Sequence, residues 1–145
     1  MVVINSEMGP AMFSPGVVIY EKTSRWEAVL KRYFANHDIQ IRPCRLPAQV
    51  LTTLAEMPGS VTLIDLAAGS AAGLRLIIQV RQQVPAGAVI VVAPESLADL
   101  EWPAREFGAL AFLSESVTDG ELGRLCARQL AHRDTARVCP QFDPF

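Results

Sequence analysis

The sequence predicts an α/β domain in which five short parallel strands alternate with five helices to form a doubly wound, three-layer (βα)5 sandwich. Short apolar runs rich in β-branched residues recur along the chain. The stretches between them have helical length and apolar residues at helical spacing. The chain has 145 residues, of which 50% are hydrophobic and 19% are charged. That size and composition favour one compact domain with a core of its own.

The first strand is predicted at residues 16–20, GVVIY, which are short, apolar and β-branched. Glu21 and Lys22 follow it, and Ser24 with Glu27 three residues later has the pattern of a capping box at a helix start. Apolar residues then recur at helical spacing and predict one buried helix face: Trp26, Val29, Leu30, Tyr33 and Phe34.

The second strand is predicted at residues 39–42, which alternate apolar and polar side chains as a half-exposed edge strand would. Pro47 suits the first position of the following helix, where its missing N–H is not needed. Pro58-Gly59 ends that helix. Its buried stripe consists of Val50, Leu51, Leu54 and Met57.

The third strand is predicted at residues 61–66, VTLIDL, where Asp65 closes a continuous apolar run. Such a run predicts a central parallel strand covered on both faces. A carboxylate is expensive to bury alone. Asp65 therefore either projects from the carboxyl edge of the sheet into a crevice or caps the loop or helix that follows, and its position alone leaves both readings open. A small-residue loop then leads into a helix that ends before Pro85.

The fourth strand is predicted at residues 88–93, AVIVVA, the most continuous apolar run of the chain and therefore a fully buried strand. The segment after it predicts a weak fourth helix. Ser96 with Asp99 resembles a cap there, while Pro103 interrupts the helical pattern.

The fifth strand is predicted at residues 110–113, and Thr118 with Glu121 forms the capping box of a last amphipathic helix. The domain is expected to span residues 16–133. Prolines and sparse periodicity indicate tails at residues 1–15 and 134–145. The apolar side of the last helix consists of Leu122, Leu125, Cys126 and Leu130.

Right-handed crossovers between five parallel strands favour the flavodoxin-like strand order 2-1-3-4-5. In that order the first and third strands lie side by side. We therefore expect Glu21, Lys22 and Asp65 to share one crevice at the carboxyl edge of the sheet. Residues from the fourth and fifth strands line its rim: Ala93, Pro94, Ser114 and Glu115.

Charge and cysteine usage exclude several classes of function. The net charge of −2 provides no basic field for nucleic acid. Cys44, Cys126 and Cys139 are widely spaced, and only His37 and His132 could join them. A zinc site or a disulfide framework is therefore not expected. We expect a reducing compartment, the cytoplasm. The first residues lack the pattern of a secretory signal, and no apolar run reaches the length of a membrane span.

These features resemble response-regulator receiver domains over residues 16–132. VVIYEKTSRWEAVLKRYF follows the family's first strand, acidic pair and first helix without a gap. VTLIDLAAGSAAGLRLIIQVR follows its phosphoacceptor motif, which puts Asp65 at the phosphoacceptor position. Gly108-Ala109 matches the family's Gly-Ala before strand five, and Phe112 matches its aromatic switch position. The resemblance implies a bacterial-type two-component signalling module.

Three positions depart from the family pattern, so the resemblance is to a degenerate receiver, or pseudo-receiver. Lys22 replaces an acidic metal ligand, Glu115 replaces the lysine after the fifth strand, and Ala93 replaces a hydroxyl residue. Phosphoryl transfer needs a divalent cation and donors for the phosphoryl oxygens. We therefore expect neither Mg²⁺ nor any other cofactor.

Lys22 could instead supply a built-in cation as an ion pair with Asp65. At ~4 Å and an effective dielectric constant near 20, such a pair would interact by roughly 4 kcal/mol before desolvation is subtracted. The alternative is that Lys22 points from its loop into solvent.

The first functional reading is a non-enzymatic interaction module that works without phosphorylation. It would bind a protein partner or a second copy through the face made by the fourth helix, the fifth strand and the fifth helix. Trp102 and Phe107 are the candidate contacts, with Phe112 on the same face. For Trp102 itself burial is the leading expectation, and a role as interface anchor is the alternative.

Two further readings remain. In the second, Asp65 is a genuine phosphoacceptor with unusual supporting residues. In the third, the domain is a small enzyme or ligand-binding module on the same fold. No glycine-rich phosphate loop follows the first strand, where EKTSR stands, and neither histidine is near Asp65 in sequence.

Overall fold

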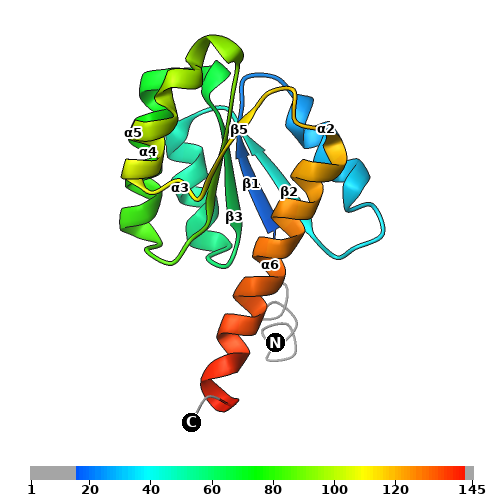
Figure 1. Ribbon diagram of the computed structural model, residues 1–145. Helices are drawn as coiled ribbons and strands as arrows, with labels where there is room; N and C mark the ends of the chain where they lie inside the picture. Colours follow the sequence, from blue (N-terminus) through cyan, green and yellow to red (C-terminus); the bar gives the residue numbers. More distant parts are fainter. Residues whose placement is uncertain (1–15, 143–145) are drawn as a thin grey trace.

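The computed structural model describes the backbone of residues 16–142 and the side chains of residues 16–132. Its centre is a five-stranded parallel sheet in the order β2-β1-β3-β4-β5, which confirms the predicted fold class and strand order (Figure 1). The strands are β1 Gly16–Tyr20, β2 Gln40–Cys44, β3 Val61–Asp65, β4 Val89–Ala93 and β5 Ala111–Ser114. The second strand extends two residues further than predicted, and the fifth begins and ends one residue later.

Helices cover both faces of this sheet (Figure 1). One face packs against α2 and α6, and the other packs against α3, α4 and α5. The α-helices are α2 Arg25–Tyr33, α3 Pro47–Glu56, α4 Ser70–Gln83, α5 Glu101–Phe107 and α6 Asp119–Phe142. Two 3₁₀ segments, η1 Leu66–Ala68 and η2 Glu95–Leu100, precede α4 and α5. The fourth helix and fifth helix of the sequence prediction are therefore α5 and α6.

The core consists of two apolar layers that share the central strands. Along β1, Val17 and Ile19 face α2 and α6, while Val18 and Tyr20 face α3 and α4. Because successive side chains of a strand point to opposite faces, a strand covered on both sides must be apolar throughout. This explains the continuous runs of β1, β3 and β4, in which every residue is buried.

Helix starts follow the sequence patterns only in part. Thr118 and Glu121 form the expected reciprocal capping box, with each backbone N–H bonded to the other side chain at 3.2 and 3.1 Å. Pro47 is the first residue of α3, as predicted. Ser24 occupies the N-cap position of α2 but forms no side-chain cap hydrogen bond. The capping box predicted at Ser24 and Glu27 was wrong, because another carboxylate already occupies that helix end, as described below.

The segment after β4 also differs from its prediction. It is a 3₁₀ segment followed by a short helix, and no side-chain cap bond is made at the start of η2, so Ser96 and Asp99 do not cap it. Pro103 lies in the first turn of α5. It does not interrupt the helix there, because the N–H groups of a first turn have no partner within the helix.

The last helix, α6, runs to Phe142 and projects well beyond the body of the domain (Figure 1). The sequence analysis assigned residues 134–145 to a tail, and the backbone of residues 134–142 continues helix α6. Helix geometry persists there without a regular apolar stripe in the sequence. Residues 1–15 and 143–145 of the predicted tails, and the side chain of Cys139, lie outside what the structure describes. Among the described helices, none combines the length and apolar character needed to cross a membrane.

Candidate functional site

The candidate site lies where β1 and β3 end together at the carboxyl edge of the sheet. The two strands are paired in parallel with Tyr20 opposite Ile64, so Glu21 and Asp65 are the next residues of neighbouring chains. Both acidic residues are buried, with Glu21 fully inaccessible and Asp65 only 9% exposed. Burial of two carboxylates side by side requires donors for each of them.

Asp65 has a hydrogen-bond donor on each carboxylate oxygen. Oδ2 accepts a hydrogen bond from the indole Nε1 of Trp26 at 3.0 Å, and Oδ1 accepts one from the backbone N–H of Ala67 at 2.9 Å. The contact with Ala67 caps η1. The cap reading of Asp65 is therefore confirmed, because Oδ1 caps the following turn, while Oδ2 faces the buried indole of Trp26.

Glu21 caps α2 from the preceding loop. Its Oε1 and Oε2 accept hydrogen bonds from the backbone N–H groups of Trp26 and Glu27 at 2.9 and 3.0 Å. These donors belong to the first turn of α2, where N–H groups otherwise lack partners. Burial is the largest influence on Glu21 and raises the pKa of its carboxyl group, and the nearby Asp65 carboxylate raises it further.

Lys22 does not form the expected pair with Asp65. Its side chain is exposed, and no ion pair joins it to Asp65 among the residues that the structure describes. Each Asp65 oxygen already has one N–H donor, which reduces what a further donor would gain there. A lysine ammonium would also have to lose its water to reach this buried carboxylate, and Lys22 remains in solvent.

Arg25 is a cation that reaches this edge, and no sequence pattern pointed to it. Its guanidinium lies 4.1 Å from the ring centroid of Trp26. The same group donates a hydrogen bond to the backbone oxygen of Glu115 and forms an ion pair with the Glu115 carboxylate at 3.6 Å. Glu115, which follows β5, is thus tied to the start of α2 and not to Asp65.

Arg45 is a second residue that the sequence did not single out. Its guanidinium donates hydrogen bonds to the backbone oxygens of Glu21 and Thr23, both at 3.2 Å, and to Ser24 Oγ at 2.9 Å. Arg45 therefore fastens the loop between β1 and α2 to the end of β2.

The far rim of the site contains the two switch positions. Ala93 is buried at the end of β4, and Phe112 is half-buried against the core on β5. Both line a cavity of about 160 Å³ with Glu95, Glu101 and Ser114. Ala93 offers no hydroxyl to this cavity.

The face formed by α5 and the loop before β5 carries three of the exposed large apolar side chains. Trp102 is 70% exposed, Leu110 is 48% exposed and Phe107 is 38% exposed. The expectation that Trp102 is buried was therefore wrong. A seven-residue helix has few positions facing the core, and Ala104 is the residue of α5 that is buried.

Two buried carboxylates at this edge could in principle be oxygen ligands, and both are engaged in hydrogen bonds. Mg²⁺ requires oxygen ligands in octahedral geometry. Glu21 and Asp65 already direct their oxygens to N–H donors, and Lys22 stands where a third carboxylate would be needed. In the described part of the chain, no group of three His, Cys, Asp or Glu residues is arranged to hold a metal.

Solved structures with this architecture are numerous, although no protein-family model and no curated protein matches the chain. A signal receiver domain of an HD domain-containing protein from Pseudomonas fluorescens superposes with a TM-score of 0.73 at 19% identity, covering 86% of this chain and 92% of that one. The signal receiver domain of a putative LuxO repressor protein from Vibrio parahaemolyticus gives 0.71 at 19% identity, covering 88% and 98%.

A response regulator from Thermotoga maritima gives a TM-score of 0.69 at 16% identity, covering 82% of this chain and 99% of that one. All three similarities extend over most of both chains. Together with the strand order and the position of Asp65 at the end of β3, they show that this chain has the fold of response-regulator receiver domains.

Proposed function

We propose that the chain is a signalling module of the two-component type that acts through protein contacts and not through phosphorylation of Asp65. On this proposal it is a degenerate receiver with no catalytic step of its own. It is proposed to need no Mg²⁺, because each oxygen of the two buried carboxylates already accepts an N–H hydrogen bond and Lys22 replaces a further acidic ligand.

The observation that carries this proposal is the 3.0 Å hydrogen bond from Trp26 Nε1 to Asp65 Oδ2. A phosphoacceptor must present an oxygen to its phosphodonor with a metal beside it. Here a buried indole, 1% exposed, occupies that side of the carboxylate. Attack of Asp65 Oδ2 on a phosphodonor would require the Trp26 indole to leave its packed position. Among the described residues, no cationic side chain is paired with Asp65.

The residues around Asp65 support the same conclusion. Transfer of a phosphoryl group needs positive charge near its oxygens. Glu115 brings a negative charge to the position after β5, and the Arg25 guanidinium is already paired with it. Lys22 is exposed to solvent. A phosphoryl group on Asp65 would therefore lack the charge stabilisation that the reaction requires.

Intact-mass measurement after incubation with acetyl phosphate and Mg²⁺ tests the proposal. We expect no adduct on the wild-type chain, and the Asp65→Asn variant should give the same spectrum. A receiver domain with a complete acidic pair and lysine, treated in parallel, shows that the reagent is active. An adduct on the wild type that Asp65→Asn abolishes would instead make Asp65 a genuine phosphoacceptor.

A magnesium titration tests the cofactor part separately. The Trp102→Phe variant retains Trp26 as its one tryptophan, and the indole of Trp26 touches Asp65, so its fluorescence reports on this carboxylate. We expect no saturable change with Mg²⁺. Tight binding that disappears on further substitution of Asp65→Asn would contradict the proposal.

The surface for protein contact is proposed to be the α5, β5 and α6 face. Trp102 and Phe107 are exposed there, and large exposed aromatic residues are the commonest anchors of protein interfaces. The occupant is a protein partner or a second copy of the chain, and not nucleic acid or a membrane surface. Four exposed acidic residues on η2 and α5 disfavour both of the latter surfaces: Glu95, Asp99, Glu101 and Glu106.

A further inference from the structure

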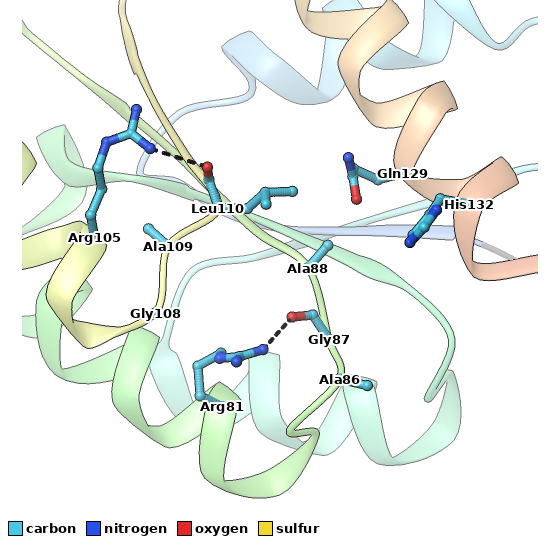
Figure 2. A pocket seen from close by; sticks show the side chains of 10 residues that line it. All are labelled: Arg81, Ala86, Gly87, Ala88, Arg105, Gly108, Ala109, Leu110, Gln129 and His132. Carbon is cyan, nitrogen blue, oxygen red and sulfur yellow. Dashed lines mark hydrogen bonds between the residues drawn. The ribbon is translucent and has the colours of Figure 1, made fainter. Parts of the chain in front are cut away.

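A second concave region lies at the opposite edge of the sheet from Asp65, where β4 and β5 begin. It is a cavity of about 370 Å³ between the ends of α4 and α5 and the middle of α6 (Figure 2). The loops before β4 and β5 form its floor, with small residues such as Gly87 and Ala109. This volume falls within the range of small-molecule pockets, roughly 300–1,000 Å³.

Among the residues that the structure describes, the ionisable side chains that line this pocket are basic. Arg81 comes from α4, Arg105 comes from α5, and His132 comes from α6 beside Gln129. Figure 2 shows Gln129 and His132 across the pocket from the two arginines. The chain as a whole is acidic, with 13 Lys and Arg residues against 15 Asp and Glu residues. The gathering of basic groups here is therefore a local feature and not a consequence of overall charge.

Arg81 is held in position by its surroundings. Its Nη1 donates a hydrogen bond to the backbone oxygen of Gly87 at 2.9 Å. Gly108 adopts a φ of +122°, and a Cβ at that residue would lie 2.8 Å from Arg81 Cγ and Nε. A glycine is needed at this position for both reasons. The absence of a side chain at Gly108 allows the Arg81 guanidinium to lie against the backbone at the pocket wall.

Arg105 is held in a similar way on the other side of the same loop. Its Nε pairs with Glu101 at 2.9 Å, and its Nη1 donates a hydrogen bond to the backbone oxygen of Leu110 at 3.2 Å. A guanidinium carries five N–H donors. Within the described residues, Arg81 uses one nitrogen and Arg105 uses two, so both arginines keep donors for a further acceptor.

We propose that this pocket binds a small molecule through an oxyanion group, either phosphate or carboxylate. Guanidinium groups match the geometry of both oxyanions, and side chains that are already ordered lose little entropy when the ligand binds. The amide of Gln129 adds a neutral donor opposite the arginines. The site is distinct from Asp65, and its occupancy does not depend on whether Asp65 accepts a phosphoryl group.

Calorimetric titration of the full chain with inorganic phosphate, pyrophosphate and citrate tests this proposal, with ionic strength held constant by sodium chloride. We expect saturable binding of at least one probe. Tighter binding of pyrophosphate than of citrate would assign a phosphate ligand, and the reverse order would assign a carboxylate ligand. Absence of saturable binding of all three probes up to about 10 mM, a range in which even weak sites fill, would overturn the proposal.

Variants locate the binding. Leu110 lines the pocket and is 48% exposed, so Leu110→Glu places a negative charge there without disturbing the core. It should weaken binding by about tenfold or more, whereas Leu46→Glu, at a leucine that is 59% exposed elsewhere, should leave binding unchanged.

Charge removal provides a second pair of variants. Arg81→Gln should also weaken binding by about tenfold, and Arg128→Gln on the exposed side of α6 should not change it. Equal losses in Arg81→Gln and Arg128→Gln would mean that only general charge attraction is measured, and the pocket proposal would fail. Asp65→Asn should bind the probes as the wild type does.

Discussion

At the scale of single residues, the carboxyl edge of the sheet is built around one neutral donor. The Trp26 indole donates a hydrogen bond to the buried Asp65 Oδ2 without bringing a charge to it. A neutral donor avoids the desolvation of a cation. The negative charges of Glu21 and Asp65 are instead stabilised by N–H groups at the starts of α2 and η1.

Trp26→Phe is predicted to destabilise the fold. The substitution leaves Asp65 Oδ2 buried without its indole donor, which costs about 1–3 kcal/mol, and loss of indole volume adds to this. Urea denaturation of wild type and variant measures the difference. Trp102→Phe, at a side chain that is 70% exposed, should change the free energy of unfolding by no more than about 0.5 kcal/mol. Equal effects of the two substitutions would contradict the role assigned to Trp26.

Glu21 is predicted to make stability fall as the pH rises. Its pKa is raised in the folded state above the ordinary value of 4.5, mainly by burial, so the folded protein holds this proton more tightly than the unfolded chain does. The stabilisation is fully present below pH 4.5 and is lost as the pH rises through the folded-state pKa. The free energy of unfolding of wild type minus that of Glu21→Gln should therefore decrease over this window.

Glu27 provides the control with opposite sign. A hydrogen bond from Lys31 lowers the pKa of Glu27, so its contribution is present above pH 4.5 and is lost as the pH falls through the lowered value. The difference between wild type and Glu27→Gln should increase with pH. A difference curve for Glu21→Gln that also rises with pH would show that its burial is not the dominant influence.

At the scale of elements, the packing of α2 against α6 depends on a close approach at one glycine. Gly123 is buried in α6, and a Cβ there would overlap the ring of Tyr33 in α2. Gly120 lies one turn earlier, where a Cβ would meet only Arg124 Nη1 at 3.6 Å. The contact with α2 therefore requires a glycine at position 123, whereas the space around position 120 can hold a Cβ.

The substitutions Gly123→Ala and Gly120→Ala are predicted to have opposite effects. Gly123→Ala should destabilise by about 1–3 kcal/mol, because Tyr33 must move from its packed position. Gly120→Ala should be neutral or stabilise by up to about 1 kcal/mol, because alanine favours helix. Thermal unfolding of both variants measures the difference. Stabilisation by both alanines would show that Tyr33 can move away from residue 123 at little cost in free energy.

At the scale of the whole molecule, the two edges and the α5 face differ in character. The carboxyl edge has its carboxylates buried and satisfied, the opposite edge has a basic pocket, and the α5 face carries exposed aromatic and acidic side chains. Both oxygens of the central carboxylate, Asp65, accept hydrogen bonds within the domain, so the outer surfaces are the places where a partner or ligand can bind. We therefore expect regulation through binding and not through modification at Asp65.

Trp102→Ala is predicted to weaken self-association or partner binding and to leave the melting temperature nearly unchanged. The side chain is mostly in solvent, so its removal leaves no cavity in the core. Sedimentation velocity at increasing concentration measures self-association, and calorimetric binding serves once a partner is identified. Leu46→Ala, at another exposed apolar residue, is the matched control. A large fall in melting temperature on Trp102→Ala would show that Trp102 supports the fold.

Much of the architecture could be predicted from the sequence because its signals lie within a few neighbouring residues. Continuous apolar runs identified the buried strands, Pro47 marked the start of α3, and Thr118 with Glu121 marked the start of α6. Alternation of strands with helices, together with the handedness of crossovers, favoured the strand order that the structure has.

Only the tertiary structure decided how the site is satisfied. Trp26 and Asp65 are 39 positions apart, and Arg25 and Glu115 are 90 apart. The sequence pointed to Lys22 as the partner of Asp65 and to Ser24 as the cap of α2, whereas in the structure Trp26 meets Asp65 and Glu21 caps α2. Which donor meets which acceptor depends on where the sheet brings distant segments together and on the desolvation of each group, and neither is determined by residue order. The sequence alone determined the fold and the position of Asp65. The tertiary packing around Asp65 determined which N–H groups its two oxygens meet.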